Sequence, residues 1–461
     1  MSPVNPILNT DSYKLSHYLQ YPGDTRAISS YIEARGLSPR PEVVFFGLQM
    51  FLKEYLARPV TKMDILEAAE VSVAHGLPFN REGWLGIVER HGGHMPVAIE
   101  ALPEGTVVRR GVPMLQIVNT DPACAWVTSY LETALLRAVW YPSSVASNAR
   151  KLKDMLMPFL ERTCEDPAAL LPSLLHDFGS RAATSYEQAG LGGAAHLVQF
   201  ATTDTLAGIL YARKYYGARM AGTSFPAAEH ATMTSWGQPR EAEAYANMIE
   251  KFGTGTYSVV SDSYDINNAV AEIWGKQLID RVRAAGGTLI VRPDSGDPID
   301  TPVRVVAQLA YAFGTHLNAK GFKVINDNVR VLQGDGVSGQ DIAMVLGRME
   351  AAGFSAENIL FGMGSGLMQK VTRDSYSFTM KASARQDAAG HWHDIAKRPA
   401  MMNEKASKSG RLAVTHQLGD LAGIRLDELG RQANSLIPVW KDGELLVDQT
   451  FDDIRTRAAE A

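Results

Sequence analysis

The chain has 461 residues, 46% of them hydrophobic and 21% charged, and its 45 Lys and Arg against 50 Asp and Glu give a net charge of −5. This length can bury a large core and is compatible with two or three domains or with one elaborated barrel. The weak negative charge argues against a nucleic-acid binder, so any phosphate chemistry must use local positive charge.

Export and membrane spanning are not expected either. Residues 1–24 lack a basic region followed by an apolar one, and no run of about 18 apolar residues occurs. The two cysteines, Cys124 and Cys164, are too few for a disulfide framework. We therefore expect a cytoplasmic protein with no membrane or nucleic-acid partner.

Residues 1 to about 170 mix two kinds of pattern. Helical periodicity occurs at 48–59 and 125–160, and short strand-like runs occur at 94–102 and 107–118. This mixture predicts an α+β domain, which we expect the segment from about 384 to 461 to complete.

From about residue 172 the pattern becomes strand, polar loop and helix in repetition. Apolar runs typical of strands lie at 173–178, 196–200, 218–225, 257–262, 288–294, 329–335 and 357–364. Helical patterns lie at 203–217, 241–253, 264–287, 301–314 and 338–353, several of them ending in glycine. This alternation predicts a parallel sheet, and seven or eight units suggest a TIM-like (β/α) barrel as the catalytic domain of residues 171–383.

The polar stretch 384–410 is predicted to be a loop-like insertion. It is basic, because seven Lys or Arg side chains lie in it or beside it: Lys381, Arg385, Lys397, Arg398, Lys405, Lys408 and Arg411. A solvated loop without a specific role is one interpretation of this stretch.

Polar residues follow the predicted strands where each one ends, and in such a barrel these ends form the active site. They are His176, Asp177, Phe178 and Arg181; Thr203 and Asp204; Glu229 and His230; Asp262; Arg292 and Asp294; Gly334 and Asp335; and Gly364, Ser365 and Gly366. Taken singly, several suit helix caps, such as Thr203 or Asp204 before 205–212 and Asp262 or Ser263 before 264–270. Taken together, the arginines, carboxylates, histidine and glycine loop are typical of a phosphate and sugar site.

Short sequence motifs favour an anion-binding site and argue against several other kinds of site. The glycines of "FGMGSGLMQKVTRD" can admit an anion at the start of a predicted helix, "LMQKVTRD". No dinucleotide fingerprint or P-loop occurs, and Asp177-Phe178-Gly179 lacks the other kinase motifs. The histidines show no zinc-ligand spacing, so we expect no fixed protein-ligated metal site. His230 is either a cap or core histidine or an acceptor of a proton or phosphoryl group.

At these residues the chain resembles the nicotinate and nicotinamide phosphoribosyltransferase family, the type II phosphoribosyltransferases. The matching segments are "TDSYKLSHYLQYP", "LHDFGSRAATSYEQAG", "TTDTLAGILYARKYYG", "PAAEHATMTSWG", "VVSDSYDINNAV", "RPDSGDP", "VLQGDGV" and "FGMGSGLMQKVTRD". They occur in family order between residue 10 and about 412, more loosely at 40–165 and hardly at all at 384–404.

The resemblance implies transfer of a 5-phosphoribosyl group from phosphoribosyl pyrophosphate to nicotinamide, with Mg²⁺ accompanying the pyrophosphate. It implies that Phe178 stacks on the pyridine ring and that Tyr13, from the second subunit of a homodimer, covers the other face. Asp204 would accept from the carboxamide, which selects the amide over the acid.

Further roles come from the same resemblance. Asp11 is a further substrate-binding residue, Arg181 and Arg292 hold the carboxamide side and the phosphate, and Asp294 binds the ribose hydroxyls. Residues expected to line the phosphate end are Gly334, Asp335, Gly364 and Ser365. Cations expected on pyrophosphate or nucleotide phosphates are Arg35, Arg373, Lys381 and Lys397.

His230 corresponds to the histidine that ATP phosphorylates in this family, with Glu229 and Asp262 nearby to orient it. The chain departs from the family pattern at Ser365, where glycine is frequent, and across 384–404. The alternative activity is nicotinate phosphoribosyltransferase, with Asp204 as the discriminating residue, and the alternative class is a non-catalytic barrel that binds ligands.

Overall fold

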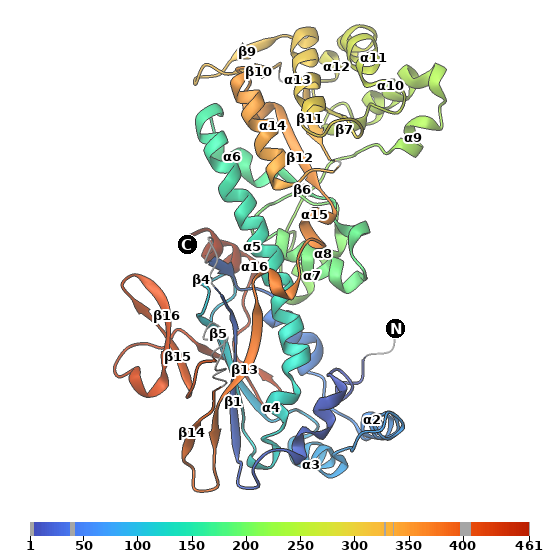
Figure 1. Ribbon diagram of the computed structural model, residues 1–461. Coiled ribbons are helices and arrows are strands. Elements are labelled where there is room, and N and C mark those ends of the chain that lie inside the picture. The colour runs from blue at the N-terminus through green and yellow to red at the C-terminus, as the bar shows by residue number, and fades with distance from the viewer. Residues whose placement is uncertain (1–3, 37–41, 327–328, 335, 397–406, 461) are drawn as a thin grey trace. The chain divides into compact units, whose positions relative to one another are not determined.

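The computed structural model describes residues 4–36, 42–326, 329–334, 336–396 and 407–460, which form two compact units (Figure 1). Unit 1 comprises Met1–Ser147, Tyr211–Ala218 and Val371–Ala461, and unit 2 comprises Asn148–Leu210 and Arg219–Lys370. The boundary at Ser147 falls inside the long helix α5 (Glu132–Thr163). The domain boundaries at about 170 and 383 stay a prediction. In the described ranges, no helix has the length and apolar character needed to span a membrane.

Unit 1 is built on a seven-stranded antiparallel sheet with the order β14-β13-β1-β5-β3-β17-β18. Its strands are β1 (Ala27–Ala34), β3 (Val97–Ala101), β5 (Pro113–Asn119), β13 (Phe378–Gln386), β14 (Trp392–Asp394), β17 (Ile437–Lys441) and β18 (Glu444–Leu445). Two smaller pairs are β2 (Glu42–Val44) with β4 (Val107–Arg109) and β15 (Leu412–Gln417) with β16 (Asp420–Arg425). Strands from both ends of the chain therefore share one sheet, since β1 pairs with β13 and β3 pairs with β17.

Helices of unit 1 supply the rest of its core. They are α1 (Leu48–Phe51), α2 (Lys62–Ala74), α3 (Arg81–His91), α4 (Val127–Tyr130), the first half of α5 and α16 (Phe451–Glu460), with a π-helical turn at Leu52–Leu56 and a 3-10 helix, η1, at Ser12–Leu19. In α2, the Thr61 hydroxyl accepts from the Asp64 N–H and the Asp64 side chain accepts from the Thr61 N–H, a capping box that fixes where the helix begins. The predicted helical pattern at 48–59 thus becomes a short α-helix that widens into a π-turn.

The predicted loop at 384–410 is wrong at its start, where β13 and β14 form a hairpin. Asp387 closes the turn, because its Oδ1 accepts from the Ala389 and His391 N–H groups at 2.9 and 3.0 Å. Side-chain bonds of this kind stabilise a turn that composition alone does not distinguish from a loop. Residues 397–406 lie outside the described residues.

Unit 2 contains a five-stranded parallel sheet with the order β6-β12-β11-β8-β7. The strands are β6 (Leu175–Asp177), β7 (Thr256–Val260), β8 (Thr288–Arg292), β11 (Val329–Gln333) and β12 (Ile359–Met363). These five agree with the predicted runs at 173–178, 257–262, 288–294, 329–335 and 357–364. The architecture is thus a mixed α/β fold with a parallel sheet, as the alternating pattern predicts.

Two predicted strands are not regular strands. The run 196–200 begins at the last residue of helix α7 (Tyr186–His196), whose start is capped by the Ser185 side chain. Helix α7 continues to His196 although it contains three glycines, and parallel pairing occurs later, as single bridges of Asp177 with Thr203 and of Thr202 with Thr223. The run 218–225 likewise carries a single isolated bridge, at Thr223.

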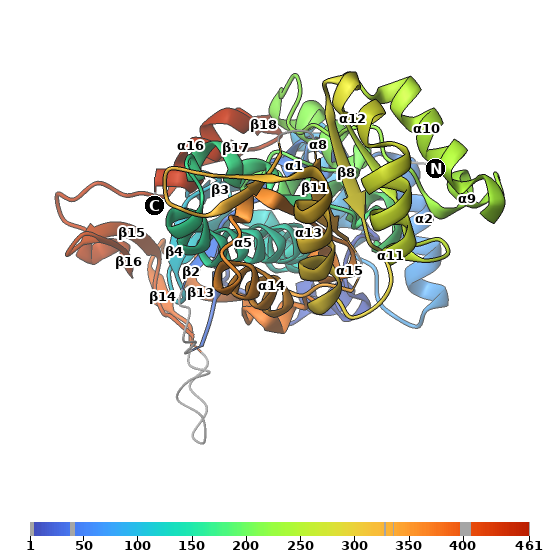
Figure 2. The same cartoon turned by 90° about the horizontal axis from the view of Figure 1, so that it is seen from above.

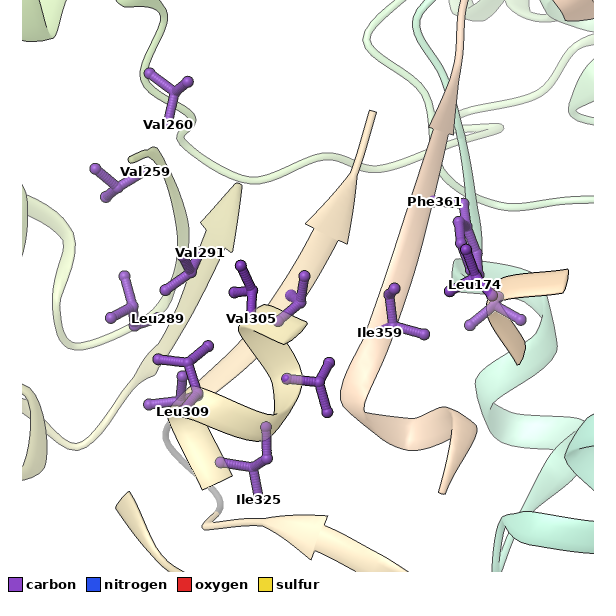
Figure 3. Packing of buried hydrophobic residues seen from close by; sticks show 14 of the residues in the cluster. Leu174, Val259, Val260, Leu289, Val291, Val305, Leu309, Ile325, Ile359 and Phe361 are labelled. Carbon is purple, nitrogen blue, oxygen red and sulfur yellow. The ribbon is translucent and has the colours of Figure 1, made fainter. Parts of the chain in front are cut away.

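Alternation along each strand sorts side chains between two faces of the sheet. Leu289 and Val291 of β8 pack in the same buried cluster as Val305 and Leu309 of α13 (Asp300–Phe313), as Figure 3 shows. The other face of β8 therefore carries Ile290 and Arg292, and the same alternation sends Phe178, Gly334 and Gly362 to that face in the neighbouring strands.

Helices cover the apolar face of the parallel sheet. Figure 2 shows α13 beside α14 (Gly339–Ala351), and the two helices are in contact. The other helices of unit 2 are α6 (Pro167–Leu170), α8 (Leu206–Tyr216, shared with unit 1), α9 (His230–Thr234), α10 (Glu241–Phe252), α11 (Ile266–Asn268), α12 (Ile279–Ala285) and α15 (Ser365–Met368), with a π-helical segment at Ala269–Gln277 and a β9 (Thr315–Leu317) and β10 (Lys323–Ile325) hairpin.

Candidate active site

Phe178 follows β6 and its ring lies over a floor of glycines. A Cβ atom at Gly362 would lie 2.1 Å from Cε2 of Phe178, and one at Gly334 would lie 2.9 Å from the same atom. Neither position can therefore hold a larger residue without moving the ring. The Arg292 guanidinium lies 5.6 Å from the ring centroid, within reach of a cation–π contact.

A hollow of about 190 Å³ opens beside this ring. It is lined by Phe178, Ser180, Arg181, Asp204, Thr205 and Arg292. Asp204 is exposed, and its Oδ1 accepts a hydrogen bond of 2.5 Å from the Ser224 hydroxyl. The hollow thus combines an aromatic face, two guanidinium groups and one oriented carboxylate, which suits a flat aromatic ring with a polar substituent.

A second hollow of about 260 Å³ shares Arg181 and Arg292 with the first. Its other lining residues are Glu229, His230, Ala231, Val260 and Asp294. Arg292 donates from Nε and Nη2 to the single oxygen Oδ1 of Asp294, at 2.9 and 2.6 Å. The second carboxylate oxygen of Asp294 is not used by this ion pair and lies 3.8 Å from Nδ1 of His230.

His230 lies between two carboxylates and is hydrogen-bonded to one of them. Nε2 lies 3.2 Å from Oδ1 of Asp262, whose side chain is 2% exposed, whereas the His230 side chain is 47% exposed. The interpretation of His230 as a core histidine is therefore wrong. Glu229 is the N-cap residue of α9, so His230 occupies the first position of that helix. With Nε2–H donated to Asp262, the lone pair of the ring is on Nδ1.

The capping alternative is wrong for Asp262, because helix α11 is capped by Asp265, whose Oδ1 accepts from the N–H groups of Asn267 and Asn268. Thr203 does act on the backbone before helix α8, because its hydroxyl oxygen accepts from the Thr205 N–H at 2.9 Å. The residue before Asp262 is held by a buried side chain: the Ser261 hydroxyl accepts from the Trp274 indole N–H at 3.1 Å.

The sequence did not single out Ser224, Ser261 or Trp274. Ser224 belongs to the irregular segment after α8, and Trp274 lies in the π-helical segment Ala269–Gln277. The only available signal for Trp274 was an aromatic residue in a helical pattern, which is more often plain core. Its ring also stacks on Tyr245 with centroids 4.6 Å apart.

His176 lies on the same face as Phe178 but is buried, and burial lowers the pKa of its imidazole to about 4. Its ring centroid is 4.9 Å from that of Phe225. The imidazole is therefore neutral at pH 7, and His176 lines neither hollow.

The glycine-rich segment after β12 is shorter as a helix than predicted. Helix α15 ends at Met368, and Thr372 begins a separate 3-10 turn with a capping box to Ser375. The β-branched pair Val371-Thr372 favours this interruption. Gly364 approaches the Phe178 carbonyl, since a Cβ there would lie 3.4 Å from that oxygen, and Ser365 is exposed at the start of α15.

Five of the predicted site residues that the structure describes belong to unit 1. Asp11 Oδ2 accepts from the Thr133 hydroxyl at 2.6 Å, and Tyr13 is 55% exposed. Arg35 follows β1, and Lys381 stands opposite Tyr31 in the β1–β13 pair. Arg373 is exposed and pairs with its neighbour Asp374 at 2.9 Å.

The predicted site residues Asp335 and Lys397 lie outside the described residues.

Comparisons with solved structures concern the fold. The chain is similar in fold to the crystal structures of nicotinate-nucleotide pyrophosphorylase from Pyrococcus furiosus (TM-score 0.63, 17% identity, covering 99% of this chain and 95% of that one) and of human nicotinic acid phosphoribosyltransferase (TM-score 0.58, 19% identity, covering 98% and 93%). At these identities the likeness concerns the fold alone.

Comparisons of the sequence show the family to which the chain belongs. Residues 173–434 match the model of the nicotinate phosphoribosyltransferase family, and residues 5–99 match that of the nicotinamide phosphoribosyltransferase N-terminal domain. Relatives called nicotinamide phosphoribosyltransferase come from Xanthomonas campestris pv. campestris (47% identical, covering 99% of this chain and 98% of the relative) and Acinetobacter baylyi (30%, covering 99% and 97%). The chain belongs to the nicotinate phosphoribosyltransferase family and is a phosphoribosyltransferase, as the sequence motifs indicate.

Proposed function

We propose that the chain is a nicotinamide phosphoribosyltransferase that forms nicotinamide mononucleotide and pyrophosphate from nicotinamide and phosphoribosyl pyrophosphate, in salvage of nicotinamide for NAD synthesis. The observation that carries this proposal is the Asp204 carboxylate, oriented by Ser224 in the hollow that Phe178 lines. The relative that is 47% identical over nearly the whole chain supports the same substrate.

In this proposal the first hollow holds the pyridine ring against Phe178. The carboxamide NH₂ donates to Asp204, and Arg181 or Arg292 donates to the carboxamide oxygen. A carboxylate in place of the carboxamide would face the like charge of Asp204 in a partly desolvated pocket, which costs up to several kcal/mol. The amide is therefore the preferred substrate.

The second hollow holds the sugar and its phosphates. The Asp294 oxygen that Arg292 leaves unused accepts from the ribose hydroxyls, and the Arg292 guanidinium faces phosphate. As the bond from C1 to pyrophosphate breaks, positive charge develops on the sugar and negative charge on the leaving group. The pyridine nitrogen then attacks C1, so catalysis consists of positioning and of charge stabilisation by these side chains.

We propose further that His230 accepts a phosphoryl group from ATP. The Nδ1 lone pair attacks the γ-phosphorus, the bond to the ADP oxygen breaks, and water later hydrolyses the phosphohistidine. The Asp262 carboxylate supports this role because it accepts from Nε2 and stabilises the positive ring. Glu229 lies on the same hollow, where its charge adds to that stabilisation.

Mg²⁺ is expected to enter with the pyrophosphate group. The described residues contain no group of three or more His, Cys, Asp or Glu side chains that could hold a metal ion. Magnesium is commonly bound by one or two carboxylates together with substrate phosphates, and Asp294 and Glu229 are the carboxylates on the second hollow. Bound there, the ion would neutralise charge on the leaving pyrophosphate.

The remaining expectations are kept as parts of the proposal. They are a homodimer in which Tyr13 of the partner subunit covers the second face of the base, substrate contact by Asp11, phosphate binding by Gly334, Asp335, Gly364, Ser365, Arg35, Arg373, Lys381 and Lys397, and a cytoplasmic location. The exposed ring of Tyr13 supports the first of these. Two buried free cysteines, Cys124 and Cys164, are compatible with the last.

We also propose that the parallel sheet closes into a TIM-like barrel. Its two edge strands, β6 and β7, each continue through an isolated parallel bridge, Asp177 with Thr203 and Ser258 with Ala227. A third bridge, Thr202 with Thr223, joins the two segments that these bridges reach. A domain division near 170 and 383 around this barrel belongs to the same proposal.

Product analysis tests the function. The purified protein is incubated with nicotinamide, phosphoribosyl pyrophosphate and Mg²⁺, with and without ATP, and nicotinamide mononucleotide is detected by mass. We expect product in both reactions and more of it with ATP. Absence of the mononucleotide under both conditions contradicts the proposal.

An Asp204→Ala variant tests the carrying observation, with Asp280→Ala in helix α12 as the matched control because Asp280 is also exposed. We expect the first variant to lose most of its preference for nicotinamide over nicotinate and the control to keep it. The specific rival is nicotinate phosphoribosyltransferase, favoured by the two guanidinium groups of Arg181 and Arg292 in the same hollow.

A further inference from the structure

Two separate turns supply most of the residues that line the first hollow. One turn follows β6 and carries Phe178 and Arg181, and the other carries Asp204. A buried carboxylate that faces neither hollow stands between them. Asp177 is 0% exposed and is absent from the lining of both hollows, so it does not contact substrate.

Asp177 is hydrogen-bonded to both turns. Its Oδ1 accepts from the Gly179 N–H at 2.7 Å, which closes the turn around Phe178. Its Oδ2 accepts from the Thr203 hydroxyl at 3.2 Å, and its backbone carbonyl accepts from the Asp204 N–H at 2.9 Å. Three bonds from one residue thus join the aromatic wall of the hollow to its carboxylate wall.

Thr203 extends this connection. Its hydroxyl donates to Asp177 and accepts from the Thr205 N–H at 2.9 Å, so it also fixes the backbone on the far side of Asp204. Two further links join the same turns: the Asp177–Thr203 bridge and the bond of 3.3 Å from the Asp177 N–H to the Thr202 carbonyl.

We infer that Asp177 and Thr203 form a clamp that sets the distance between the stacking face of Phe178 and the amide acceptor Asp204, and that they are positioning residues for base recognition. The inference rests on the proposed function for its substrate. Hydrogen bonds to a charged, buried acceptor are strong enough for this purpose, since each contributes more than a bond between neutral groups. If the clamp exists, loss of the Thr203 hydroxyl should raise KM for nicotinamide and leave KM for phosphoribosyl pyrophosphate unchanged.

Thr203→Val tests the clamp because valine keeps the shape and removes the hydroxyl. Thr203→Ser restores the hydroxyl, and Thr202→Val is the matched control. Thr202 is also buried, but its hydroxyl donates to the Leu175 carbonyl and not to Asp177. We expect Thr203→Val to raise KM for nicotinamide about tenfold, equivalent to about 1.4 kcal/mol, with KM for phosphoribosyl pyrophosphate within about twofold of the parent. Thr203→Ser and Thr202→Val should stay near the parent in both constants.

A measurement without turnover separates the clamp from the proposed function. Hydrogen–deuterium exchange of the substrate-free protein should increase at 177–182 and 203–206 in Thr203→Val and stay unchanged there in Thr202→Val. Equal exchange in the two variants, or equal KM values for nicotinamide, overturns the clamp. If the parent forms no nicotinamide mononucleotide but Thr203→Val still loosens both segments, the clamp stands and the proposed function fails.

Discussion

The glycine floor under Phe178 allows a steric test of the base site. In Gly362→Ala the new Cβ would lie 2.1 Å from Cε2 of Phe178, whereas contacting carbon atoms are about 3.5 Å apart or more. The ring must therefore move by about 1.4 Å. Displacement of a substrate-positioning group by about 1 Å can cost about 100-fold in rate. We expect kcat/KM for nicotinamide to fall by about that factor.

The same substitution elsewhere supplies the control. In Gly347→Ala, in helix α14, the new Cβ meets nothing within 4 Å. The assay is steady-state formation of nicotinamide mononucleotide, with thermal unfolding of each variant to confirm folding. Gly347→Ala should keep the activity of the parent, and Gly362→Ala should lose about 100-fold in kcat/KM. A folded Gly362→Ala protein with the activity of Gly347→Ala would refute the placement of the base on Phe178.

Three further predictions concern charge and buried polar groups. His230→Gln should abolish labelling by γ-labelled ATP and stimulation by ATP, while His316→Gln on strand β9 should change neither; equal labelling of both rules out His230 as acceptor. Burial raises the pKa of Asp177 from 3.8 to about 6, so its contribution to the free energy of unfolding is present below pH 3.8 and lost as pH rises through 6. In urea unfolding, the free energy of unfolding of the parent should therefore fall by up to about 3 kcal/mol relative to that of Asp177→Asn between pH 4 and pH 7. Parallel pH profiles for the two proteins would contradict this. Tyr216→Phe removes a 2.7 Å hydrogen bond to the fully buried Glu104 carboxylate and should lower the free energy of unfolding by about 1.5–3 kcal/mol, which an unchanged urea midpoint would disprove.

Much of the parallel sheet could be predicted because its strands are short apolar runs that are followed by polar residues or glycine. Thr288–Arg292 is an example, and alternation along it also predicts that Arg292 leaves the core face. The segments 196–200 and 218–225 could not be placed in this way. His196 ends a helix, and the bridges of Thr202 and Thr223 depend on partners distant in the sequence.

Some residues of the site could be identified from the local sequence pattern, whereas others are brought to it only by the fold. Strand ends located Phe178, Arg292 and Asp294 because parallel strands deliver their carboxyl ends to one edge. Ser224 could not be found, since its hydroxyl reaches Asp204 across an irregular segment that shows no periodicity. The clamp at Asp177 was equally hidden, because a buried aspartate after a strand is not distinguishable in sequence from one that lines the site.

The central claim is that Asp204 and Phe178 together select the amide of nicotinamide. Competition in one reaction tests it most directly: nicotinamide and nicotinate are mixed at equal concentration with limiting phosphoribosyl pyrophosphate and ATP, and the two mononucleotides are quantified by mass. Their ratio equals the ratio of the two kcat/KM values. The account predicts a large excess of nicotinamide mononucleotide, and an excess of nicotinate mononucleotide would contradict it.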